Sequence, residues 1–255
     1  PNASFALLQD AYMQQFGATR EDFGRIAVAQ RANALKNPQA IMKKPLSLDQ
    51  YLEGRMISDP IGLFDCVMPC AGAEAFVVMR EEIAVAKGLP FARISATIER
   101  TNAFPEDPMQ LRGGWAVDVD ELWQMAGHGP DEIDVLQTYD DYPVICLMQF
   151  EDLGFSAKGA GAEFVRRHDL TIGGDFPHNT SGGQLSVGQA GAAGGYLGLV
   201  EALRQVTGTA GPTQVEGARR AAVAGFGVNN YDPGLWSSAG VTEGGTSCTD
   251  PRSPR

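Results

Sequence analysis

The residues most suggestive of chemistry lie in the stretch HNTSGGQLSVGQAGAAGG, from His178 to Gly195. It begins with a histidine, whose ordinary pKa suits acid/base catalysis near neutral pH, and it places Gln189 among glycines and alanines. Glycine permits backbone angles closed to other residues and lets a backbone approach another backbone or a ligand. The stretch therefore suits either a loop that receives a ligand or the tight packing of a helix start against a sheet.

Two phosphate-binding patterns do not fit this stretch. Its glycines do not follow the dinucleotide-binding spacing after a strand, and it lacks the Lys-Ser/Thr ending of a P-loop. His178 is a candidate acid/base beside the glycines, with a hydrogen-bonded structural histidine as the alternative. His128, in GHGP, and His168, in RRHD, are predicted to lie in solvated loops.

The cysteines show neither a zinc-ligand spacing with histidine nor a disulfide framework. Pro69 lies between Cys66 and Cys70 and disfavours the regular helix that would place both thiols on one face. We interpret this pair as buried, small, apolar side chains, and we predict no metal site.

The charge of the chain argues against polyanionic partners. Acidic residues outnumber basic ones by 31 to 20, for a formal net charge of -11, whereas binding to phosphate-rich surfaces needs a surplus of Lys and Arg. No run approaches the roughly 20 apolar residues that span a bilayer, and no basic segment followed by an apolar one opens the chain. We therefore expect a cytoplasmic protein with no nucleic-acid or membrane partner.

The elements that position these residues begin with helices. Apolar residues at helical intervals predict a helix over residues 4–16, with Gly17 as its C-terminal cap. A capping pattern at Thr19 predicts a second helix that Asn37-Pro38 ends, and a similar pattern at Ser47 predicts a short third helix.

After the third predicted helix, the sequence pattern changes to strands that alternate with helices. The runs EAFVVM (Glu74–Met79) and FARISATI (Phe91–Ile98) predict strands, separated by a helical turn, and a helix is predicted to end near Gly127. The run IDVLQT predicts a strand leading into Tyr139. A helix after the glycine-rich stretch and the strand AAVAGFG complete the pattern, which predicts an α/β layered fold with a sheet covered on both faces.

Four segments, in order, resemble the thiolase superfamily, in particular its sterol-carrier-protein-type, or lipid-transfer, thiolases. Asn179 to Gly195 resembles the family's NxSGG segment, which leads through a small-residue loop into a helix. The other three segments are DPIGLFDCVMPCAGAEAFVV, DEIDVLQTYDDY and EALRQVTGTAGPTQVEGARRAAVAGFG. Together the matches span roughly Pro38 to Gly227.

The resemblance implies a thiolase-like layered fold of two similar halves, with helices on both faces of mixed sheets, that forms a homodimer. The chain looks like the C-terminal two-thirds of such a protein. We expect residues 1–92 to be the remainder of the N-terminal half, with a helical loop region, 93–241 to be the C-terminal half, and 242–255 to be a flexible tail. The family's nucleophilic cysteine would lie in the missing N-terminal portion, because none of the four cysteines here matches its position.

The chain departs from the family at the positions that carry chemistry. Tyr139 stands where the family has His or Asn, and Gln189 stands where a Gly-His-Pro segment has its histidine. Glutamine can donate a hydrogen bond to an oxyanion but cannot take a proton, whereas a tyrosine with a lowered pKa could act as a base. Tyr231 lies in a loop near the C-terminus, which we expect to face the same active-site cavity as Tyr139 and Gln189. Asp140 and Asp141 are predicted to lie in a solvated turn, with the tuning of a neighbouring tyrosine or of a water as the alternative. Tyr142 is predicted to aim away from the site or to pack.

These departures resemble a subgroup of lipid-transfer thiolases that cleave a β-hydroxyacyl-CoA by a retro-aldol route, typically on a steroid side chain. That reaction needs a base for the β-hydroxyl and stabilisation of the thioester enolate, but no acyl-enzyme. The resemblance implies coenzyme A only as part of the substrate, and a small zinc-containing OB-fold partner. The expected catalytic residues are Tyr139, Gln189, His178 and Tyr231, and the expected substrate-binding residues are Asn179, Ser181, Gly182, Gly183, Gly188 and Gly191.

Two alternatives remain open from the sequence. One is thiolytic acyl transfer, as in an acetyl-CoA acyltransferase, with the nucleophilic cysteine in the missing N-terminal part. The other is a non-catalytic subunit that completes a partner's pocket in a heteromeric thiolase-like complex.

Overall fold

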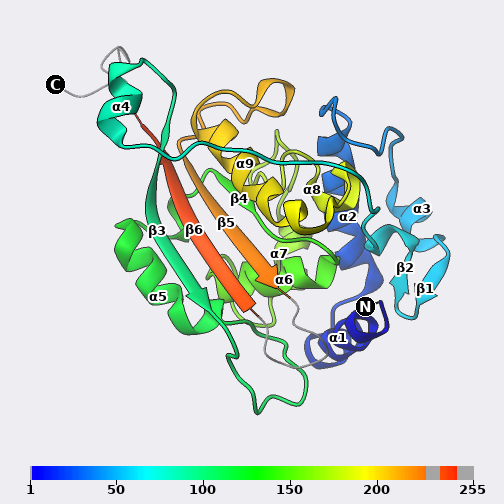
Figure 1. Ribbon diagram of the computed structural model, residues 1–255. Coiled ribbons are helices and arrows are strands. Elements are labelled where there is room, and N and C mark those ends of the chain that lie inside the picture. Colours follow the sequence, from blue (N-terminus) through cyan, green and yellow to red (C-terminus); the bar gives the residue numbers. More distant parts are fainter. Residues whose placement is uncertain (1, 228–235, 246–255) are drawn as a thin grey trace.

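The computed structural model of the chain describes residues 2–227 and 236–245. In chain order its main elements are α1 (Asn2–Phe16), α2 (Arg20–Ala34), α3 (Leu48–Leu52), β1 (Met56–Ser58), β2 (Ile61–Gly62), α4 (Glu81–Ala86), β3 (Ala92–Arg100), α5 (Trp115–Ala126), β4 (Val135–Gln137), α6 (Pro143–Asp152), α7 (Gly161–Arg167), α8 (Gly183–Val187), α9 (Gly194–Val206), β5 (Arg220–Gly227) and β6 (Trp236–Gly244). These helices and strands are labelled in Figure 1, and short 3-10 turns connect several of them. Among the residues described, no helix combines the length and apolarity needed to cross a membrane.

The central feature is a mixed four-stranded sheet with the order β3-β6-β5-β4. β6 lies antiparallel to both of its neighbours, and β4 lies parallel to β5. Side chains alternate along β5, because successive residues of a strand point to opposite faces. Ala222, Ala224 and Phe226 join the core that includes α5 and α6, whereas Ala221 packs in a separate cluster with α9. Both faces are therefore covered, which confirms the predicted layered α/β fold.

The larger core is fixed by a buried tryptophan at the start of α5. Trp115 is fully buried and stacks on Phe226 of β5, with ring centroids 5.9 Å apart. Its indole Nε1 donates a hydrogen bond of 2.8 Å to the carbonyl of Ser238 in β6. One side chain thus ties α5 to two neighbouring strands and satisfies its own polar atom.

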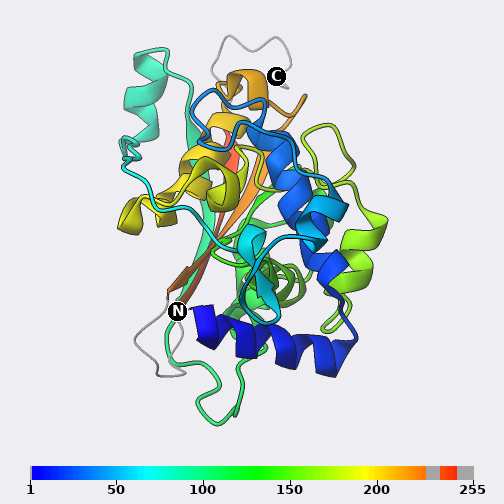
Figure 2. The same cartoon turned by 90° about the vertical axis from the view of Figure 1, so that its right-hand side faces the viewer.

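The two N-terminal helices form a separate layer beside this sheet. Figure 2 shows α1 running across the bottom of the molecule and α2 rising from its end. The capping box predicted from Thr19 is present, with Asp22 accepting the Thr19 backbone N–H at 2.8 Å. The Asp22 carboxylate also pairs with Arg166 of α7 at 2.7 Å. α2 packs against α6, α7 and α8, and through α8 it contacts the glycine-rich stretch.

One local prediction was wrong, and two elements were not predicted. Residues 74–79 form no strand, because they pair with no other strand within the described part of the chain, and Val77 remains 81% exposed. Residues 143–152, which the pattern left unassigned, form α6, whose residues are all buried and so show no amphipathic period. β6 was also not predicted, and it extends to Gly244, past the residue 242 at which a tail was expected to begin.

Candidate active site

The site lies where β4 ends. The segment around His178 runs parallel beside this strand: the Leu136 amide donates to the Pro177 carbonyl at 3.1 Å, and the Asn179 amide donates to the Leu136 carbonyl at 3.0 Å. Tyr139 follows directly after the strand, at its carboxyl end. The pairing therefore places the start of the glycine-rich stretch next to the segment Tyr139–Tyr142, although the two are about forty residues apart in sequence.

Tyr139, Asp141 and Gln189 form one hydrogen-bonded group. The Tyr139 hydroxyl donates to Asp141 Oδ2 at 3.2 Å, and Gln189 Nε2 donates to the same hydroxyl at 3.3 Å. Gln189 Nε2 also donates to Asp141 Oδ1. The backbone of Gln189 is fixed on both sides, since its amide donates to Met68 and its carbonyl accepts from Cys70, each at 2.9 Å. The two positions that departed from the thiolase pattern are thus in direct contact.

The ionisation of this group corrects one expectation. Burial, the charge of Asp141 and the hydrogen bond to it raise the pKa of Tyr139, whereas the sequence interpretation required a lowered value. Burial also raises the pKa of Asp141 to about 6. At neutral pH the tyrosine is therefore a hydrogen-bond donor, and its carboxylate neighbour is ionised.

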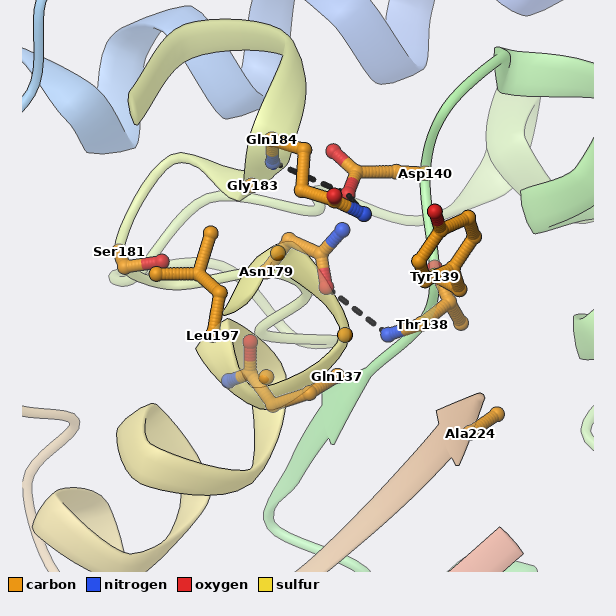
Figure 3. Close-up of a pocket in the computed structure, with 13 residues that line it drawn as sticks. Gln137, Thr138, Tyr139, Asp140, Asn179, Ser181, Gly183, Gln184, Leu197 and Ala224 are labelled. Carbon is orange, nitrogen blue, oxygen red and sulfur yellow. Dashed lines mark hydrogen bonds between the residues drawn. The ribbon is translucent and has the colours of Figure 1, made fainter. Parts of the chain in front are cut away.

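Asp140 is buried rather than solvated, so the predicted solvated turn was wrong. Its side chain is 1% exposed and accepts the backbone amides of Gln184 at 3.0 Å and Leu185 at 3.2 Å, at the start of α8 (Figure 3). Burial raises the pKa of Asp140 to about 7, and the two amide bonds act in the opposite direction. The carboxylate therefore anchors the glycine-rich stretch to the end of β4.

Three predicted binding glycines make close contact with the chain itself. A Cβ at Gly182 would lie 2.4 Å from Ala34 Cβ, one at Gly183 would lie 2.1 Å from Asp140 Oδ2, and one at Gly188 would lie 2.8 Å from Cys70 Sγ. Gly191 differs, since a Cβ there would meet nothing within 4 Å. Tight packing thus accounts for the first three, and a binding role for any of these glycines stays a prediction.

Asn179 and Ser181 line a small cavity together with Tyr139 and Gly183 (Figure 3). Asn179 has a positive φ of 42°, and its Oδ1 accepts the Thr138 amide at 2.9 Å. Its Nδ2 is buried with no hydrogen-bond partner among the described residues. A buried amide donor without a partner is costly, so this nitrogen is a polar atom that a ligand or a water in the cavity would satisfy. Gln184, which lines the same cavity, has a second such atom in its Oε1.

His178 lies apart from the tyrosine hydroxyl. It is fully buried, its Nε2 contacts Thr138 Oγ1 at 2.7 Å, and its ring packs edge-on against Phe150. Burial lowers the pKa of His178 to about 3, so the ring is neutral. This geometry favours the structural alternative, and a direct acid/base role has no contact in the described structure to support it.

A buried polar network was missed by the sequence interpretation. Glu201 Oε1 accepts from Thr180 Oγ1 at 2.7 Å, Gln205 Nε2 at 2.9 Å and Thr213 Oγ1 at 3.0 Å. Gln137 Nε2 in turn donates to Thr180 Oγ1 at 3.0 Å. The signal was present, because Glu201 and Gln205 are four residues apart on one helix. The network connects Asn179–Gly183 (the NTSGG segment) to α9 by hydrogen bonds.

The remaining candidates are placed as follows. Tyr231 lies outside the described residues. Tyr142 packs as predicted: its ring stacks on Phe5 at 4.3 Å between centroids, and its hydroxyl donates to Asn2 at 2.6 Å. Over residues 2–227 and 236–245, no cluster of three His, Cys, Asp or Glu side chains could hold a metal ion.

The layered sheet and the glycine-rich helix start at the end of β4 define an α/β protein of the thiolase type. Residues 106–233, half of the chain, match the thiolase C-terminal domain-like family, and the chain belongs to that family.

Two similar proteins and one similar solved structure have names that specify a reaction. The chain is 34% identical to a steroid side-chain-cleaving aldolase of Thermomonospora curvata, over 80% of this chain and 54% of the relative. It is 33% identical to a 17-hydroxy-3-oxo-4-pregnene-20-carboxyl-CoA lyase of Mycobacterium tuberculosis, over 82% of this chain and 55% of the relative. The solved structure of an Ltp2-ChsH2(DUF35) aldolase is similar, with a TM-score of 0.79 and 28% identity, over 94% of this chain and 63% of that chain. The chain spans about half the length of the curated relatives it matches.

Proposed function

We propose that the protein containing this chain cleaves a β-hydroxyacyl-CoA by a retro-aldol reaction, in steroid or lipid catabolism. The observation that carries the proposal is the Tyr139 hydroxyl at the end of β4, hydrogen-bonded to Gln189 at 3.3 Å. A Claisen thiolase needs a thiolate and a second acid/base at its centre, and an amide supplies neither. A retro-aldol cleavage needs only a group that receives the β-hydroxyl proton and donors that stabilise the enolate.

In this proposal Tyr139 receives the proton of the substrate's β-hydroxyl. The bond between the α- and β-carbons breaks, the β-carbon becomes a carbonyl, and the electron pair enters the thioester enolate. Asn179 is the donor best suited to a substrate oxygen, because its Nδ2 is buried, has no partner among the described residues and belongs to a residue that lines the cavity. Coenzyme A enters only as part of the substrate.

We further propose that the protein works as a homodimer together with a small zinc-containing OB-fold subunit. The support is the similarity to the Ltp2-ChsH2(DUF35) aldolase, whose name joins two components. Co-purification of the full-length protein with the product of a neighbouring gene, followed by a zinc assay of each component, tests this part separately from the reaction.

The test of the reaction uses 17-hydroxy-3-oxo-4-pregnene-20-carboxyl-CoA, the compound in the name of one relative. The full-length protein, with any subunit that co-purifies, is expected to release a 17-ketosteroid and propionyl-CoA without added coenzyme A. Tyr139→Phe is expected to lower kcat by about 10²- to 10⁴-fold, the usual contribution of a positioned acid/base group.

Tyr142→Phe is the matched control, because it removes one hydroxyl from the same segment but one that bonds to Asn2. Its rate should stay close to that of the wild type. Unchanged turnover in Tyr139→Phe would refute the assignment of Tyr139. Cleavage only of a β-ketoacyl-CoA, and only with free coenzyme A, would instead establish thiolytic acyl transfer. Binding without turnover of either thioester would establish a non-catalytic subunit.

A further inference from the structure

The tyrosine that receives the substrate proton is itself a weak candidate for a free base. Burial and the neighbouring Asp141 charge raise the pKa of Tyr139, so its phenolate is not populated at neutral pH. A neutral tyrosine can still accept a proton if its own proton leaves in the same step. The group that accepts the tyrosine's proton then decides whether the site works.

We propose that Asp141 is the terminal proton acceptor of this site, reached through the Tyr139 hydroxyl, and that Gln189 holds the carboxylate in position. This inference rests on the proposed function and deepens it. In this proposal Asp141 contacts Tyr139 and not the substrate, so it affects the reaction through Tyr139.

The geometry supports this assignment. Asp141 Oδ2 accepts the Tyr139 hydroxyl at 3.2 Å, while Asp141 Oδ1 accepts from Gln189 Nε2. The same amide nitrogen donates to the Tyr139 oxygen at 3.3 Å. That donation directs the hydroxyl proton away from Gln189 and toward the carboxylate, and it leaves the second lone pair of the phenolic oxygen for a substrate hydroxyl. The amide side chain cannot itself take a proton.

Within residues 2–227 and 236–245, Asp141 forms no ion pair that would offset its charge. The titratable groups on which its charge acts in this part of the chain are acids: Tyr139, Asp140 and Tyr142 on its own segment and Cys146 on α6. The pKa of Asp141 is raised to about 6 by burial. It is therefore ionised at pH 7 and more basic than an exposed carboxylate.

The proton balance closes without any further reactant. In the cleavage step the substrate hydroxyl proton moves to Tyr139, and the Tyr139 proton moves to Asp141 Oδ2. The α–β carbon bond breaks, leaving a ketone and a thioester enolate. The proton then returns to the α-carbon of the enolate, and Asp141 is ionised again. No proton is gained or lost overall.

The experiment compares Asp141→Asn, Asp141→Glu and a control, Asp175→Asn, in the full-length protein with its co-purifying subunit. Asp175 is an exposed carboxylate that contacts His168 away from the site. The wild type and the control should show kcat/KM rising with pH through a midpoint near 6, as Asp141 ionises in the free enzyme. Asp141→Asn should lose that rise, and its kcat should fall by at least about 100-fold. Asp141→Glu should restore part of the rise in kcat/KM and part of kcat.

A second measurement does not depend on turnover. With ¹³Cζ-labelled tyrosine, the Tyr139 resonance, assigned by its loss in Tyr139→Phe, should shift with a midpoint near pH 6 in the wild type and in Asp175→Asn. The step near pH 6 should be lost in Asp141→Asn, which leaves only the titration of Asp140 near pH 7, whose charge also acts on Tyr139. An active wild type whose rate and pH profile are matched by Asp141→Asn would refute the acceptor and leave the aldolase proposal standing. A wild type that leaves the thioester intact would refute the proposed function itself.

Discussion

Gly183 tests whether the glycine-rich stretch is shaped by packing against Asp140. Gly183 begins α8 with a φ of 61°, in the left-handed region, where an alanine costs about 1–2 kcal/mol. A Cβ there would lie 2.1 Å from Asp140 Oδ2 and 2.8 Å from Gln30 Oε1. Gly183→Ala must therefore displace the Asp140 carboxylate from its place.

The displaced carboxylate would lose at least one of its two amide hydrogen bonds, from Gln184 or Leu185. A hydrogen bond to a charged group contributes about 1.5–3 kcal/mol. Added to the backbone cost, Gly183→Ala should lower the free energy of unfolding by about 2.5–5 kcal/mol. Urea denaturation of the wild-type and variant full-length proteins at 25 °C, at a pH above the pKa of Asp140, measures this difference.

Gly195→Ala is the matched control in the same stretch. Gly195 lies in the first turn of α9, and a Cβ there would meet nothing within 4 Å. Alanine is favoured over glycine in a helix by about 0.8–1 kcal/mol, so stability should be unchanged or slightly higher. A loss below about 1 kcal/mol in Gly183→Ala, or equal losses in both variants, would contradict the packing account.

Two further predictions concern the pH dependence of stability. The pKa of His178 is lowered to about 3, so below the ordinary pKa of 6.5 the unfolded chain binds a proton that the folded chain does not. The free energy of unfolding should therefore fall by up to about 1.4 kcal/mol per pH unit as the pH decreases. In urea denaturation from pH 7 to pH 4, His178→Gln should reduce this dependence on pH. The pKa of Asp140 is raised from 3.8 to about 7, so between these pH values the folded state binds a proton that the unfolded state does not, and the free energy of unfolding falls as pH rises. Asp140→Asn should reduce this fall by up to about 1.4 kcal/mol per pH unit. Equal slopes in the variant and the wild type would refute the raised pKa of Asp140.

Local signals predicted much of the fold. The capping patterns at Thr19 and Ser47 were both confirmed, because a cap involves residues only three apart. Gly127 ends α5 in the left-handed conformation, as its place after the apolar period indicated. The strand predicted at residues 74–79 was wrong, since apolar composition marks a strand only where a partner strand is available to pair with it.

The candidate site was predicted in part. Tyr139 and Gln189 were singled out because they depart from a motif, and the structure brings them into contact across 50 residues of sequence. The burial of Asp140 and the partial burial of Asp141 were missed, because two adjacent acids shortly before a proline are typical of a solvated turn. The burial of Asp140 depends on α8, whose amides reach it only when the chain is folded.

The sequence by itself determined several helices, three strands of the central sheet, the family and the two substituted positions, because each depends on neighbours along the chain or on the order of short motifs. The tertiary structure alone decided which groups meet. Parallel pairing beside β4 aligns the NTSGG segment with the strand's end, and that pairing depends on contacts between distant segments. The folded chain joins a tyrosine, a glutamine and an aspartate into one hydrogen-bonded group. Burial of that group raises the pKa values of the tyrosine and the aspartate by removing water, which no spacing in the sequence expresses.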